Sequence, residues 1–101
     1  MLPSITRHAP ASPIAVLLNA NARSVNARVT AQIQGVVPSE HLFLSRCAEE
    51  AHRIADTVID RGYGTVFTGG GDGTFVSWVN HILDRAELEE APPPRFGVLP
   101  L

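Results

Sequence analysis

The sequence predicts an α/β fold with a parallel β-sheet, and three observations support this prediction. Short apolar, β-branched segments alternate with longer segments whose apolar residues recur at helical spacing. Glycine or proline follows most of the longer segments, and a run of glycines joins one expected strand directly to the next helix. This alternation is typical of βαβ units with right-handed crossovers, which build a three-layer structure with helices on the faces of the sheet.

The chain of 101 residues is long enough for one small domain, and its 45% of apolar residues can supply a modest core. Residues 1–13 contain three prolines and are expected to form a flexible leader before a domain over residues 14–101. The expected elements are a strand at 14–18, a helix over 25–36, a strand at 41–44, a helix over about 46–61, a strand at 64–68, a helix from 72–74 to 86, and a strand that begins at 95.

Three packing expectations follow from the helical spacing. Cys47 falls on the apolar stripe of the second helix and is expected to be a small buried hydrophobe. Trp78 is expected to be a half-buried packing residue. The stripe of the first helix is expected to face the core with Val25, Val29, Ile33 and Val36.

Composition excludes several classes of protein. The formal net charge of −2 gives no basic field for nucleic acid, and a single cysteine excludes an internal disulfide. The apolar run at 14–18 is shorter than the roughly 7–15 residues of a signal-peptide core and far below the ~18 of a membrane span. The four histidines lack the paired spacing of a zinc site, so no metal ligands are assigned within the chain.

The most informative stretch is Gly69-Gly70-Gly71-Asp72-Gly73-Thr74, between an expected strand and an expected helix. Glycines allow positive φ and close approach of a ligand to the backbone, while a helix start offers free N–H groups to an anion such as phosphate. A Walker A loop is excluded because the chain contains no lysine. The dinucleotide fingerprint G-x-G-x-x-G is not met, because Thr74 stands where its third glycine should be.

The five residues Gly70 to Thr74 resemble the Gly-Gly-Asp-Gly-Thr signature of the diacylglycerol kinase catalytic family, which is related to the NAD kinases and phosphofructokinases. The resemblance implies a Rossmann-like nucleotide-binding domain that binds ATP and works with Mg²⁺. It further implies that the glycines, with Gly69, hold nucleotide phosphates and that Thr74 adds a hydroxyl contact. Asp72 is implied to be catalytic, near the metal or the attacking hydroxyl, although an aspartate here could also cap the helix.

Three further residues become candidate nucleotide contacts by this resemblance, each with a structural alternative. Asn19 follows the first strand, where it could instead turn the chain through its own hydrogen bonds. Ser45 follows the second strand, where it could also cap the next helix. Asn80 matches an asparagine of the family's helix, where it could equally be a polar packing residue.

The chain departs from the family pattern at two positions and stops early. Val76 and Ser77 stand where bacterial members carry Asn and Glu, so the glutamate contact near the metal or phosphate is missing or supplied elsewhere. The segment 98–101 resembles the corresponding segment of the lipid kinases in this family more than that of the NAD kinases. In the lipid kinases the strand runs on into a second nucleotide loop, so the domain is expected to be incomplete at its C-terminus.

The expected function is that of the ATP-binding half of a lipid kinase, which transfers the γ-phosphoryl group to a diacylglycerol-like or sphingoid hydroxyl. The metal site and the lipid at the membrane surface would be served by parts outside this chain, so the isolated fragment is expected to be inactive. Such a protein would be cytoplasmic and peripheral to the membrane. The alternatives are an NAD kinase-like enzyme fragment and a non-catalytic nucleotide-binding or partner module. A homo-oligomer is a possible state, since an unpaired sheet edge invites self-pairing.

Overall fold

The computed structural model describes residues 13–70 and 72–101, except for the side chains of Asp72 and Thr74. The proposed leader at 1–13 therefore lies outside the described residues, apart from Pro13. The elements are, in order, β1 (Ile14–Asn19), α2 (Ala27–Gln34), the short 3₁₀ helix η1 (Ser39–His41), β2 (Leu42–Ser45), α3 (Ala48–Arg61), β3 (Thr65–Gly69), α4 (Asp72–Leu88) and β4 (Arg95–Val98).

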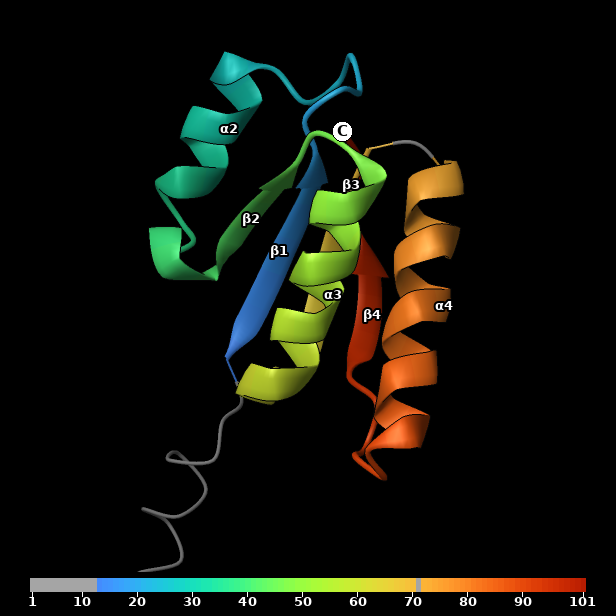
Figure 1. The fold of residues 1–101 in the computed structure, drawn as a ribbon. Helices are drawn as coiled ribbons and strands as arrows, with labels where there is room; N and C mark the ends of the chain where they lie inside the picture. The colour runs from blue at the N-terminus through green and yellow to red at the C-terminus, as the bar shows by residue number, and fades with distance from the viewer. Residues whose placement is uncertain (1–12, 71) are drawn as a thin grey trace, which may run out of the picture.

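The four strands form one parallel sheet in the order β2-β1-β3-β4, which confirms the predicted α/β class. Figure 1 shows the sheet with its carboxyl ends together at the top, where α3 and α4 also begin. The chain leaves β1 for one neighbour, β2, and later leaves β3 in the opposite direction for β4. The point between β1 and β3 is therefore the topological switch point, where open α/β sheets bind ligands.

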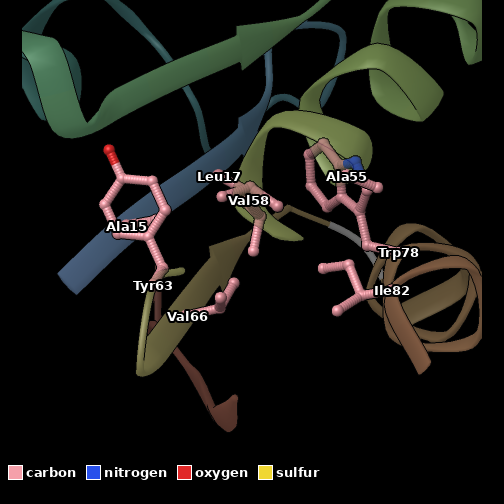
Figure 2. Close-up of a cluster of buried hydrophobic side chains, with 8 residues drawn as sticks. All are labelled: Ala15, Leu17, Ala55, Val58, Tyr63, Val66, Trp78 and Ile82. Carbon is pink, nitrogen blue, oxygen red and sulfur yellow. The ribbon is translucent and has the colours of Figure 1, made fainter. Parts of the chain in front are cut away.

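The central strand β1 is buried on both faces, which explains its continuous apolar sequence. Ala15 and Leu17 point into one cluster with residues of α3 and α4, whereas Val16 and Leu18 point into a second cluster with Val25. Figure 2 shows the first cluster, in which side chains of β1, β3, α3 and α4 meet. The two helices α3 and α4 thus cover one face of the sheet, and the segment that contains Val25 and α2 packs against the other face.

The helix ends are set by local backbone chemistry. Asn26 caps α2, because its side-chain oxygen accepts a hydrogen bond from the Val29 N–H at 2.9 Å. The helix then stops at Gln34 with Gly35 as its C-cap, and Gly35 with Pro38 is the stop signal that the sequence offers. At the end of α3, Gly62 adopts the left-handed conformation with φ 71°. The last helix, α4, extends to Leu88, two residues beyond its expected end at 86.

Three packing expectations are corrected. Val36 is 84% exposed, because α2 ends before it and its side chain no longer belongs to the helical stripe. Cys47 is exposed, because it is the N-cap residue of α3 rather than part of its inward face. Trp78 is fully buried rather than half-buried, at 1% exposure.

The junction between α3 and α4 carries a polar network on its outer side. Asp56 accepts hydrogen bonds from Arg85 at 2.7 Å and pairs with His81 at 3.2 Å. A hydrogen bond with Glu89 is the main reason that the pKa of Arg85 is raised above its ordinary value. The imidazole ring of His81 also stacks on that of His52, with 4.5 Å between the centroids. In the described part of the chain, no helix combines the length and apolar character needed to cross a bilayer.

Candidate functional site

The parallel register brings three distant segments of the chain to one edge of the sheet. Asn19 of β1 lies opposite Ser45 of β2, and Leu18 of β1 lies opposite Gly69 of β3. Beyond these pairs, the Ala20 N–H donates to the Ser45 carbonyl oxygen at 2.8 Å. The Asn19 segment, Ser45 and the glycine loop at residues 69–74 therefore meet at one edge of the sheet.

Side-chain amides join the loops that follow β1 and β2. The Asn19 side-chain oxygen accepts a hydrogen bond from the Asn21 backbone N–H at 3.0 Å, as in an Asx turn. The Asn21 Nδ2 group then donates to the Arg46 carbonyl oxygen at 2.7 Å. The Ser45 hydroxyl is buried and donates to the Cys47 carbonyl oxygen at 2.9 Å. The loop that carries Asn19 and the loop that carries Ser45 thus form one hydrogen-bonded wall.

The first glycines of the loop are required by the fold itself. Gly70 has φ 134°, and a Cβ added there would lie 2.9 Å from the Asn19 Cβ. A Cβ added at Gly69 would lie 2.7 Å from Leu18 and Leu101 side-chain atoms. These two glycines let the loop cross close over the ends of the neighbouring strands.

Gly73 is different, because the described part of the chain gives no steric reason for a glycine there. It lies in the first turn of α4, and a Cβ added to it would meet no described atom within 4 Å beyond its own helix backbone. The space in front of Gly73 is open, so a ligand could approach the backbone closely. Among the described glycines of the loop, Gly73 is thus the one whose surroundings fit a cradle rather than a packing requirement.

A polar pocket of about 280 Å³ lies beside this open space. Its volume is close to the lower end of the ~300–1,000 Å³ range of small-molecule sites. None of its described lining residues carries a formal charge; they offer amides, hydroxyls, a thiol and an aromatic ring. The lining consists of Asn19, Asn21, Ser45, Cys47, Ala48, Ala51, Gly73, Ser77 and Trp78.

The remaining predicted site residues stand as follows. Gly71 lies outside the described residues. Asp72 and Thr74 belong to the first turn of α4, but their side chains also lie outside the described part. Asn80 is exposed on α4 and is not among the residues that line the polar pocket. Of the candidates, the structure therefore gathers Asn19, Ser45 and Gly73 around one pocket, with Gly69 and Gly70 packed behind it.

Sequence reasoning missed several lining residues. Asn21 is absent from the family motif and could have been found only from its two hydrogen bonds, one of them to a carbonyl 25 positions away. Cys47 and Trp78 were assigned to packing alone. Ser77 was noted as a departure from the family pattern, and the structure shows that this departure lies in the pocket lining.

A larger apolar groove of about 650 Å³ lies elsewhere, on the face of the sheet next to α2. It is lined by apolar side chains such as Ile14, Ile33 and Phe67 and contains none of the predicted site residues. We assign the candidate site to the smaller pocket, because the polar groups and the glycine loop converge there.

The described residues do not provide a site for Mg²⁺. Among them, no group of three His, Cys, Asp or Glu side chains lies close enough together to hold a metal ion. Oxygen ligands are what Mg²⁺ requires, and the described residues of the pocket lining offer amides and hydroxyls but no carboxylate.

The comparison with protein families agrees with the motif. The family model described as the diacylglycerol kinase catalytic domain matches residues 13–101. No curated protein and no solved structure matches the chain.

Proposed function

Since the chain belongs to the diacylglycerol kinase catalytic domain family, whose members are lipid kinase-like, we propose that it is the ATP-binding half of a lipid kinase. The parent enzyme would transfer the γ-phosphoryl group of ATP to the hydroxyl of a diacylglycerol-like or sphingoid lipid. It would be a cytoplasmic protein that meets its lipid at the membrane surface. The isolated chain would supply nucleotide binding.

One observation carries this proposal: Gly73 opens onto a polar pocket whose wall contains Asn19 and Ser45. The first-turn N–H groups of α4 have no acceptors within the helix and favour an anion at this end. The neutral pocket beside them suits the uncharged nucleoside part of ATP, whose ribose hydroxyls and base can bond to amides and hydroxyls. The phosphates would lie over the glycine loop.

The residues would then divide the work as follows. The backbone N–H groups of Gly70, Gly71 and Gly73 would bind nucleotide phosphates, with the Thr74 hydroxyl as a further donor. Asp72 would act near the metal or the attacking hydroxyl. Mg²⁺, when bound, would offset phosphate charge, and its ligands would come from outside the described residues.

Gly73→Ala tests the proposal, because it separates ligand binding from folding. The added methyl group meets open space in the chain, so the free energy of unfolding should be unchanged or rise by ~0.4–1 kcal/mol. The same methyl group would obstruct phosphates at the backbone, so we expect the Kd of ATP, measured by calorimetry, to rise about tenfold, or ~1.4 kcal/mol. Wild-type protein that fails to bind ATP would contradict the proposal, as would unchanged affinity in the variant.

We also propose that the 101-residue chain does not complete the transfer by itself. Phosphoryl transfer depends on positioning and on charges that stabilise the transition state. Among the residues that the structure describes, the pocket lining carries neither a basic nor an acidic side chain. Release of labelled phosphatidic acid from ATP and diacylglycerol micelles by the pure chain would contradict this statement. NAD serves as the second acceptor in that assay, because its phosphorylation would instead favour an NAD kinase-like enzyme.

A non-catalytic nucleotide-binding or partner module is the second candidate, and Ser77 favours it. This residue lines the pocket at the position where the family pattern has glutamate, so the described part of the lining lacks the carboxylate that this pattern places there. This candidate would be supported over the kinase if ATP binds without phosphoryl transfer, also when the chain is tested within the full-length natural protein that contains it.

A further inference from the structure

Trp78 lies where the polar pocket meets the core between α3 and α4. Its side chain is 1% exposed and belongs to the buried cluster that includes Ala55 and Ile82. Figure 2 shows its ring reaching from α4 toward α3 beside Ala55. Trp78 also lines the polar pocket, together with Ala51 of α3 and Gly73 of α4. One side chain therefore connects the core to the candidate nucleotide site.

The indole group fixes how α4 sits against α3. Its Nε1–H donates to the Ala51 carbonyl oxygen at 3.1 Å. Sliding or rotating α4 would break this bond and leave a buried donor without an acceptor, which is costly. Two other bonds join the helices farther along, from His81 and Arg85 to Asp56. Of the three, the Trp78 bond lies nearest to the start of α4.

The start of α4 is also the part that the proposed function uses. Gly73 lies in the first turn of this helix and Trp78 in the second, so the two residues are about 1.4 turns apart along α4. A shift of the first turn would move its free N–H groups relative to Asn19 and Ser45 on the opposite wall. Misplacement of such groups by even about 1 Å weakens the contacts they make.

We propose that Trp78 is a positioning residue for nucleotide binding. The hydrogen bond from its indole group to the Ala51 carbonyl oxygen holds the first turn of α4, which includes Gly73, in a fixed position relative to α3. Binding of the nucleotide phosphates requires this position. This inference rests on the proposed function of the pocket. It predicts that the N–H group, and not only the bulk of the ring, matters for affinity.

The chain allows an isosteric test, because Trp78 is its only tryptophan. Biosynthetic replacement of tryptophan by β-(3-benzothienyl)alanine changes this position alone, keeps the bicyclic ring and substitutes sulfur for the N–H donor. Trp78→Phe is the second variant. Ile82→Val is the matched control, since Ile82 is fully buried in the same cluster about one turn farther along α4 and does not line the pocket.

Two readouts are taken at a temperature where all forms are folded. Amide hydrogen exchange of residues 76–79 without ligand reports whether the first turn of α4 is held in place, because their N–H groups bond to the carbonyl groups of that turn. Calorimetric titration with ATP reports affinity. We expect both Trp78 replacements to speed exchange at residues 76–79 and to raise the Kd of ATP, each about fivefold, as loss of one typical hydrogen bond would. Ile82→Val should leave both quantities within twofold of wild type.

The outcomes separate the inference from the function on which it rests. Unchanged exchange and unchanged Kd in the benzothienyl form would overturn the inference. An equal effect of Ile82→Val would also overturn it, because this result would show general destabilisation. Wild-type protein that does not bind ATP would contradict the proposed function. In that case faster exchange confined to the Trp78 forms would still establish that the indole holds the first turn, while unchanged exchange would refute this too.

Discussion

At the scale of single residues, the site is shaped by asparagine side chains that satisfy backbone groups. Asn19 and Asn21 make an Asx turn and a bridge to the β2 loop, whereas Asn26 caps α2. All of them lie in or beside the connection between β1 and α2. Because two of them build the pocket wall and one builds a helix end, substitutions there can distinguish binding from stability.

We predict that Asn21→Ala weakens ATP binding as well as lowering stability. The variant loses the hydrogen bond from Nδ2 to the Arg46 carbonyl oxygen, which lowers the free energy of unfolding by about 1 kcal/mol. The loops after β1 and β2 are then no longer joined by this bond. We expect the Kd of ATP to rise about fivefold in calorimetry.

Asn26→Ala is the control for this prediction. It removes one hydrogen bond between an asparagine side chain and the backbone, here with the side-chain oxygen as acceptor, and should reduce the free energy of unfolding by about 1 kcal/mol. Asn26 does not line the pocket, so the Kd of ATP should stay at its wild-type value. Equal effects of the two variants on affinity would contradict the role given to Asn21.

At the scale of elements, the helices are placed by their ends as much as by their apolar faces. Cys47 and Gly62 flank α3, and the change of direction at each end leads the chain from β2 into the helix and back to β3. Gly62 accomplishes this with a left-handed backbone, for which glycine has no steric penalty. Helix α3 in turn supplies Ala51, the acceptor for the Trp78 indole.

Gly62→Ala should therefore destabilise the domain through the backbone alone. A Cβ at this position would meet no described atom within 4 Å, so the expected loss of about 1–2 kcal/mol comes from the left-handed conformation. Chemical denaturation measures it. Gly62→Asn is expected to lose less, since asparagine tolerates this conformation better. An equal loss in both variants would argue for a steric cause that the geometry does not show.

At the scale of the whole molecule, the two faces of the sheet are covered unequally. The α3–α4 face encloses the larger buried cluster, while the α2 face carries the apolar groove. Val36 and Ile14 on that side are 84% and 46% exposed. Exposed apolar patches of this kind are typical of surfaces that associate.

The homo-oligomer suggested by the sequence stays a prediction, and this face gives it a test. We expect sedimentation velocity to show concentration-dependent association of the 101-residue chain. Val36→Glu should weaken it, because the new carboxylate would have to be desolvated at the contact. The variant should fold normally, since Val36 is largely exposed. A wild-type monomer at every concentration would contradict the prediction.

The sequence by itself determined the fold class, the element order and the family. Local signals suffice for these: the apolar run of β1, the spacing of helix stripes and the glycines after β3 each act within a few residues.

Which residues share the pocket depends on the tertiary structure. Asn21 and Arg46 meet because parallel pairing places Asn19 beside Ser45, and no local pattern encodes that register. The same holds for Trp78, whose hydrogen-bond acceptor lies 27 residues earlier in the chain. Pairing between strands and packing between helices are long-range effects, so the wall and floor of the site become visible only when the chain is folded.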